Sequence, residues 1–125
     1  MWLTAVAHIQ VTSPPEAENA MLFFYSKILG LTEITKPEAL QVNGGAWYVL
    51  GDIQIHIGIE KQPHNQESRR HLCFEVNNLE EFGKHLQAHG VEIIEDRALP
   101  ESDRFFIRDP AGNRIEIAQS SNVTN

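Results

Sequence analysis

The feature that most constrains the fold of this chain is an internal repeat. Residues 3–60 and residues 71–119 each read, in order, as a strand, a helix and three further strands. Runs rich in β-branched residues indicate the strands, and apolar residues at helical spacing indicate the two helices. Such a repeat predicts two similar modules. We therefore expect an α+β fold of two tandem βαβββ modules that form a curved mixed sheet cleft with the helices outside.

The first module is expected to contain one helix and four strands. Ser13 and Glu16 occupy the positions of a capping box, Pro14 follows the serine in the first turn, and Gly30 closes the helix. The residues of this helix that should face the core are Ala17, Met21, Phe24 and Ile28. The strands of the module are predicted over residues 3–12, 31–35, 46–50 and 53–60, with a loop over 36–44.

The second module repeats this order after a polar linker. Asn78 and Glu81 again form a capping box, and Gly90 ends the helix. The apolar stripe of the helix consists of Leu79, Phe82 and Leu86. The other segments are predicted as a linker over 61–70, strands over 71–76 and 91–95, a loop over 98–103, a hairpin over 104–117 and a tail over 120–125. We expect residues 1–125 to form a single domain.

The composition excludes some partners. The chain carries 10 Lys and Arg against 17 Asp and Glu, for a net charge of −7, so we expect no nucleic-acid partner. Cys73 is the single cysteine, which excludes a disulfide framework and a cysteine-based zinc cluster. No apolar run reaches transmembrane length, and the N-terminus lacks the basic segment of a signal peptide. These features predict a cytoplasmic protein with no membrane partner.

Glu116 is a carboxylate in the middle of an apolar strand. It lies between Ile115 and Ile117 in the closing segment of the second module. A buried carboxylate needs a partner, because an unpaired charge is costly to take out of water. The repeat places His56 at the position that Glu116 has in the other module, and it places His8 at the position of His71.

These four residues suit a metal site. Alternate strand residues share a face, so His56 and Glu116 point away from the neighbouring isoleucines, which face the helices. If the modules pack about a pseudo-twofold axis, the four side chains converge in the cleft. Imidazole and carboxylate suit a divalent ion such as Zn, Ni, Co, Mn or Fe. The other histidines are interpreted as surface residues without such a role: His64, His85 and His89.

The repeat and the closing motif resemble a known superfamily. The motif is Asp109-Pro110-Ala111-Gly112-Asn113-Arg114-Ile115-Glu116. Together with His8 and His71 at the start of the two modules, it is similar to the vicinal oxygen chelate superfamily, which contains glyoxalase I, bleomycin-resistance proteins and extradiol dioxygenases. The resemblance extends over residues 5–118. It implies a homodimer in which modules of two chains can share each site.

The resemblance implies roles for individual residues. His8, His71 and Glu116 correspond to metal ligands, and the open positions on the ion suit a small molecule with two neighbouring oxygens. His56 stands where glyoxalase I carries a second glutamate ligand. It is expected to be a fourth ligand, a base or a hydrogen-bond donor to a ligand. His56 and Glu116 are therefore the candidate catalytic residues.

The reaction is not fixed by these residues. Lyase, isomerase and dioxygenase chemistry all remain open, with His56 as the acid–base residue that a dioxygenase would need. Thr12 and Glu60 stand where glyoxalase I would have an arginine and an asparagine for glutathione. No basic residue follows Glu116, as a fosfomycin enzyme would require. The alternative is a non-enzymatic small-molecule or drug-binding protein similar to bleomycin-resistance proteins.

Aromatic residues supply the candidate pocket walls. Trp47 and Tyr48 are neighbours on one strand, so one faces the cleft and the other the helices. The same holds for Phe105 and Phe106. We select Trp47 and Phe106 as substrate-binding residues, with core packing as the competing interpretation. The cations that could anchor an anionic substrate, unless they are only surface charge, are Lys36, Arg104 and Arg108.

Overall fold

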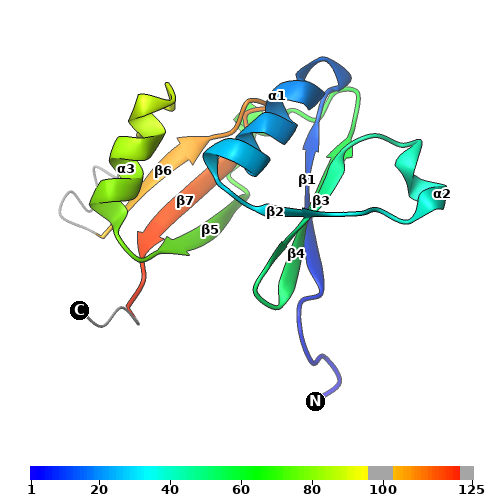
Figure 1. The fold of residues 1–125 in the computed structure, drawn as a ribbon, viewed down its shortest axis with the longest axis horizontal. Coiled ribbons are helices and arrows are strands. Elements are labelled where there is room, and N and C mark those ends of the chain that lie inside the picture. The colour runs from blue at the N-terminus through cyan, green and yellow to red at the C-terminus, as the bar shows by residue number, and fades with distance from the viewer. Residues whose placement is uncertain (96–102, 122–125) are drawn as a thin grey trace. The chain divides into compact units, whose positions relative to one another are not determined.

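The computed structural model describes residues 1–95 and 103–121 of the chain (Figure 1). The chain divides into two compact units, Met1–His64 and Asn65–Asn125. The elements of unit 1 are β1 His8–Ser13, η1 Pro15–Ala17, α1 Glu18–Phe23, η2 Phe24–Ile28, β2 Thr32–Ile34, α2 Glu38–Gln41, β3 Ala46–Leu50 and β4 Ile53–Ile59. Those of unit 2 are η3 Asn65–Glu67, β5 His71–Val76, α3 Leu79–Ala88, β6 Arg104–Arg108 and β7 Arg114–Gln119.

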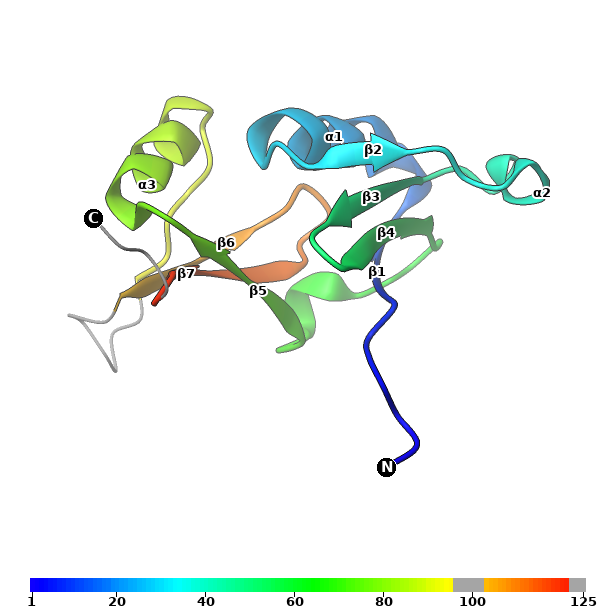
Figure 2. The same ribbon diagram turned by 60° about the horizontal axis from the view of Figure 1, so that its bottom comes forward.

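Unit 1 is a four-stranded mixed sheet with the helical segment on one face. The strand order is β1-β4-β3-β2, in which β1 is parallel to β4 and the other pairs are antiparallel. Segment α1 lies over the strands in Figure 2. As predicted, alternation directs the middle isoleucines of β4, Ile55 and Ile57, into the core with Met21. Tyr48 is also fully buried there.

The helical segment of unit 1 differs from the prediction. Ser13 does not cap it, because its Oγ donates to the carbonyl of Pro14 at 2.8 Å while the serine ends strand β1. The segment then passes through a 3-10 turn, an α-helix and a five-residue π-helix. This change of period buries Tyr25 beside Phe24, although a regular helical stripe would not select both. Gly30 closes the segment with φ +75°, as expected.

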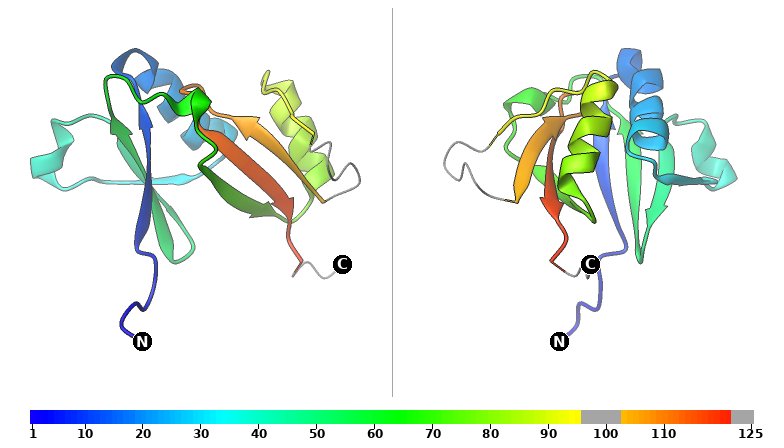
Figure 3. Two further views of the ribbon diagram at one scale, coloured as in Figure 1. Left: turned by 180° about the vertical axis from the view of Figure 1, so that it is seen from behind. Right: turned by 60° about the vertical axis from the view of Figure 1, so that its left-hand side comes forward.

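Unit 2 is a three-stranded sheet of order β5-β7-β6, with β5 parallel to β7 and β6 antiparallel to it. Helix α3 lies along one face of this sheet (Figures 2 and 3). Its predicted cap is confirmed, since Asn78 Oδ1 accepts from Glu81 N at 3.0 Å. The helix packs on the sheet at Gly83, where an added Cβ would lie 3.6 Å from the Phe105 ring, in ordinary van der Waals contact.

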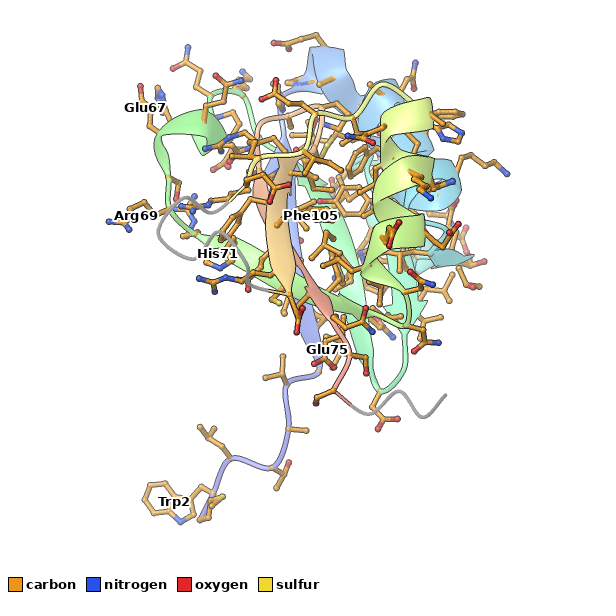
Figure 4. The ribbon with its side chains drawn as sticks, turned by 90° about the vertical axis from the view of Figure 1, so that its left-hand side faces the viewer. Trp2, Glu67, Arg69, His71, Glu75 and Phe105 are labelled. Atoms are coloured by element: carbon orange, nitrogen blue, oxygen red, sulfur yellow. The ribbon has the colours of Figure 1, made fainter. Side chains whose placement is uncertain are left out.

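Several predicted boundaries were wrong. Strand β1 begins at His8, not at residue 3, because β4 begins opposite it and offers no pairing partner for most of residues 1–7. These residues extend from the sheet (Figure 3), and Trp2 near their outer end is 96% exposed (Figure 4). Residues 91–95 form a single bridge, Ile94 to Phe106, and not a strand.

Two segments predicted to be irregular contain short helices. The loop over 36–44 includes α2, and the linker over 61–70 includes η3. The predicted loop over 98–103 falls outside the described residues except for Asp103, and so does most of the predicted tail. Within residues 1–95 and 103–121, no helix has the length and apolar character that crossing a membrane requires.

Candidate functional site

The repeat extends to the register of the strands. In unit 1, β1 runs parallel to β4 with His8 opposite Gln54; in unit 2, β5 runs parallel to β7 with His71 opposite Arg114. Two positions further along the last strand of each unit lie His56 and Glu116. The equivalence inferred from the sequence is therefore reproduced by the backbone pairing.

In unit 1, His56 is held in a stack of three rings. Its imidazole lies 4.1 Å from the His8 ring at an interplanar angle of 11°, and 3.9 Å from the Trp47 ring at 4°. The stack leaves His56 only 4% exposed. Tyr48 points to the opposite face, where its hydroxyl shares a 2.9 Å hydrogen bond with Ser26. Of the two neighbouring aromatics, Trp47 is thus the one beside His56.

The stacked histidine is kept neutral. His56 Nε2 donates to Gln54 Oε1 at 2.9 Å, which leaves the lone pair of the neutral ring on Nδ1. Burial lowers the pKa of His56 below its usual value, and the nearby His8 and Lys36 lower this pKa further. A neutral imidazole with a lone pair on Nδ1 can accept a proton or bind a metal ion.

In unit 2, Glu116 lies between His71 and Arg104. Its Oε1 lies 3.1 Å from His71 Nε2, and its Oε2 accepts from Arg104 Nη1 at 3.2 Å. The Glu116 side chain is 12% exposed. The sequence pairs Glu116 with the histidines, whereas it gives Arg104 only as a substrate anchor or as surface charge. The signal for Arg104 was its place two residues before Phe106, on the same face of the hairpin.

The His71 ring is oriented by the backbone. Its Nδ1 donates to the carbonyl of Arg69 at 3.0 Å, and Figure 4 labels both residues at the start of β5. In a neutral ring this donation leaves a lone pair on Nε2, facing the carboxylate oxygen of Glu116. Two acceptors so close need a proton or a cation between them. Histidines that bind metals generally use the other nitrogen in this way, to donate to a carbonyl or carboxylate.

The spacing of this pair fits a divalent ion. Two donor atoms at about 2.1 Å from one octahedral ion lie about 3 Å apart. The 3.1 Å between His71 Nε2 and Glu116 Oε1 matches that value. In unit 1, by contrast, the lone pairs of His8 and His56 lie in the planes of parallel rings and cannot meet at one ion unless a ring turns.

The four predicted ligands thus come together as two pairs, one in each unit. Among the described residues, no three His, Cys, Asp or Glu side chains are grouped as a metal site would require.

Cys73 lies opposite Glu116 in the β5–β7 register. Burial raises the pKa of the Cys73 thiol, and the charge of Glu116 raises it further, which keeps the sulfur protonated.

The aromatic wall of unit 2 is Phe106. Its ring meets the His71 ring edge-on, with centroids 5.6 Å apart, and Arg114 lies over it at 4.3 Å. Phe105 points to the other face, towards Gly83 of α3. Phe106 therefore shares the face of His71 and Glu116, as Trp47 shares that of His56.

The closing motif forms the turn before Glu116. Buried Asp109 accepts from the backbone of Ala111 at 3.0 Å and of Asn113 at 2.9 Å. Arg108 donates to the carbonyl of Gly112 at 2.8 Å, so it stabilises this turn. The motif thus fixes the β6–β7 register that positions Glu116.

The remaining histidines are exposed. His85 and His89 are neighbours on one turn of α3, with ring centroids 4.6 Å apart, and His89 Nδ1 bonds the carbonyl of His85. His64 lies in the linker with φ 53°. Within residues 1–95 and 103–121, these histidines do not belong to any group of three potential metal ligands.

The chain resembles known proteins in sequence and in fold. The sequence pattern of the Glyoxalase/Bleomycin resistance protein/Dioxygenase superfamily matches residues 8–117. The chain is 29% identical to Glyoxylase I 4 of Arabidopsis thaliana, over 97% of this chain and 74% of the relative. A solved glyoxalase family protein from Bacillus anthracis is 39% identical, with a TM-score of 0.84 over 97% of this chain and 98% of the other.

TnmS3, an antibiotic binding protein from Streptomyces sp. CB03234, has a TM-score of 0.74 over 97% of this chain and 99% of the other. At 19% identity, that likeness is one of fold. The family pattern covers both units from the first histidine to the strand of Glu116. The chain therefore belongs to the Glyoxalase/Bleomycin resistance protein/Dioxygenase superfamily.

Proposed function

We propose that this protein is a divalent-metal-dependent, glyoxalase-like enzyme of the lyase, isomerase or dioxygenase type. Its substrate is a small molecule that binds the ion through two neighbouring oxygens. The observation that carries the proposal is the 3.1 Å spacing of His71 Nε2 and Glu116 Oε1 in unit 2, the spacing of two donor atoms on one octahedral ion. Glyoxalase members of the superfamily generally depend on a divalent metal, which supports this interpretation.

The proposed ligands are His8, His71 and Glu116, with His56 as a fourth ligand or as the base. Imidazole nitrogens with one carboxylate suit Zn, Ni, Co, Mn or Fe. A bound ion would polarise the substrate oxygens and stabilise negative charge that develops on them. We also propose that the two pairs of residues act on the same ion, either within one chain or across a homodimer.

The chain's own groups supply the remaining tasks. His56 is neutral and carries its lone pair on Nδ1, so it is suited to take a proton from the substrate. Arg104 holds one oxygen of Glu116 and orients the carboxylate. Trp47 and Phe106 provide flat apolar walls beside the two pairs. We propose a cytoplasmic location for the enzyme.

The metal content of the purified protein tests the proposal. Protein prepared without chelators should carry a divalent ion, and Glu116→Ala should bind it on the order of a hundredfold more weakly while remaining folded. Glu80→Ala on the exposed face of α3 is the matched control and should keep the ion. Unchanged metal content in Glu116→Ala would show that the ligand assignment is wrong.

A second candidate function is non-enzymatic binding of a flat small molecule. The observation in its favour is the stack of His8, His56 and Trp47, since a further ring can extend such a stack. The antibiotic binding relative TnmS3 has the same fold. This function predicts ligand binding that is equal in the wild type and in Glu116→Ala, with no bound metal in either.

A further inference from the structure

A pocket in unit 1 lies beside the histidine stack. Its volume is about 540 Å³, and the half-buried side chain of Trp47 forms part of its wall. Roughly 300–1,000 Å³ is usual for a site that binds a small molecule. Strand β4 contributes backbone from Gly58, and α2 contributes Leu40. The pocket is formed entirely by unit 1, so it does not depend on how the units are arranged.

The charges of this pocket are of one sign. Among the described residues that line it, the charged ones are Lys36 and Lys61, although the whole chain has a net charge of −7. The Lys36 ammonium donates to the carbonyl of Gly44. An ammonium has three N–H donors, so this contact leaves donors for a bound group. Lys36 also acts electrostatically on His56, which places its charge near the stack.

The wall of the pocket combines an aromatic ring with a polar amide. One face of the Trp47 ring is occupied by His56, at 3.9 Å. Gln10 lies directly over Gly58: a Cβ added to that glycine would be only 2.7 Å from Gln10 Nε2. The missing side chain at Gly58 thus lets the Gln10 amide lie along the pocket, where it can donate a hydrogen bond.

We infer that this pocket is a subsite for a compact anionic group, a carboxylate or phosphate, on a ligand whose flat unsaturated part contacts Trp47. Lysines act as point charges and bind compact anions without the forked geometry of arginine. The aromatic wall favours a flat group next to the anion. If the ligand is the substrate, this assignment rests on the proposed function; the binding of the anion itself does not.

Tryptophan fluorescence can test the subsite directly. The chain has two tryptophans, and Trp2→Phe removes the exposed one, so that Trp47 alone reports. In this background, benzoate and phenyl phosphate should each change the emission saturably. Benzamide, of similar shape but without charge, should bind roughly tenfold more weakly than the better of the two anions. The stronger anion identifies the preferred group.

Charge-removing variants separate the pocket from other basic surface. Lys36→Gln and Lys61→Gln should each weaken binding of the preferred anion roughly three- to tenfold and leave benzamide unchanged. Lys27→Gln, on the exposed side of the π-helix, is the matched control and should have no effect. Equal affinity for benzamide and the anions, no saturable signal, or unchanged affinity in both lysine variants would overturn the inference.

The titrations should be repeated in Trp2→Phe/Glu116→Ala. Anion binding that persists there, together with loss of the metal, supports both proposals. Anion binding without any metal in the parent protein would overturn the proposed metal enzyme and leave the subsite standing. A metal-loaded protein that does not discriminate the anions from benzamide would overturn the subsite alone.

Discussion

The two units use one backbone frame for opposite chemistry. In unit 1 the central position of the last strand is His56, which is neutral and stacked between two rings. In unit 2 the same position is Glu116, whose two oxygens face His71 and Arg104. The strand registers around these two positions are equivalent, so the difference does not come from how the strands pair. The charged Glu116 lies beside polar side chains, and the His56 ring packs against other rings.

The frame also decides which partners are possible. Ala46 and Phe105 lie opposite equivalent isoleucines, so Gly45 in unit 1 corresponds to Arg104 in unit 2. Gly45 has φ +77°, and a Cβ there would lie 1.9 Å from the Ile57 carbonyl. Unit 1 therefore cannot carry the arginine that pairs with Glu116, whereas unit 2 can. The contrast predicts a graded series of effects.

The largest effect is expected at Gly45. Gly45→Ala should lower the free energy of unfolding by about 3 kcal/mol or more, because the residue has positive φ and its new Cβ meets backbone. Gly30→Ala is the control, with φ +75° and nothing within 4 Å, and should cost about 1 kcal/mol. Urea denaturation measures both. Equal costs would mean that the frame of unit 1 tolerates a side chain at Gly45.

The next largest effect is expected when the residue at position 56 is made the same as Glu116. His56→Glu places a carboxylate between two rings without an arginine, and should destabilise the metal-free protein by about 2–3 kcal/mol. Added divalent ions should recover more stability in this variant than in the wild type. His89→Glu, on the exposed end of α3, should stay within about 0.5 kcal/mol. Thermal denaturation with and without metal decides; a variant as stable as the wild type would contradict the contrast.

A smaller effect is expected from removing Arg104, the cation beside Glu116. Arg104→Met removes the cation beside the Glu116 carboxylate and should cost about 1–2 kcal/mol; partial exposure of both side chains keeps the cost below that of a fully buried pair. Lys84→Met, whose 3.6 Å pair with Glu80 is exposed, should change stability by less than about 0.5 kcal/mol. A double-mutant cycle with Glu116→Gln should give a clear coupling energy, and additive effects would argue against the pair.

The smallest effect concerns the core faces. Tyr48 in unit 1 corresponds to Ile107 in unit 2, and Tyr48→Phe removes the hydrogen bond to Ser26 at a cost of about 1 kcal/mol. Burial raises the pKa of Tyr48 above its usual value of 10.0. The unfolded chain therefore releases this proton first, and stability should fall as the pH rises above about 10. The decline should be shallower in Tyr48→Phe, as measured by denaturation at several pH values; equal slopes would contradict this.

Much of the frame was predictable, because it depends on local patterns. The two-residue period of the strands predicted which faces carry His56 and Glu116, and the cap at Asn78 formed as expected. The predicted start of the first helix was wrong, because Ser13 belongs to strand β1 and its hydroxyl donates to the carbonyl of Pro14. No local pattern in the sequence indicated the π-helix that buries Tyr25. The strand predicted over 91–95 reduced to one bridge, which depends on pairing with Phe106.

The sequence by itself determined the repeat, the equivalence of the two histidine-led strands and the donor types at the centre of each unit. Period and spacing are local properties, so they can be read along the chain. Only the tertiary structure decided which of the predicted histidines Glu116 contacts, namely His71, and that Arg104 of another strand contacts it too. It also decided that His56 is stacked between rings. Such contacts depend on strand register and on the volume that neighbouring side chains leave, and neither is encoded in a short stretch of sequence.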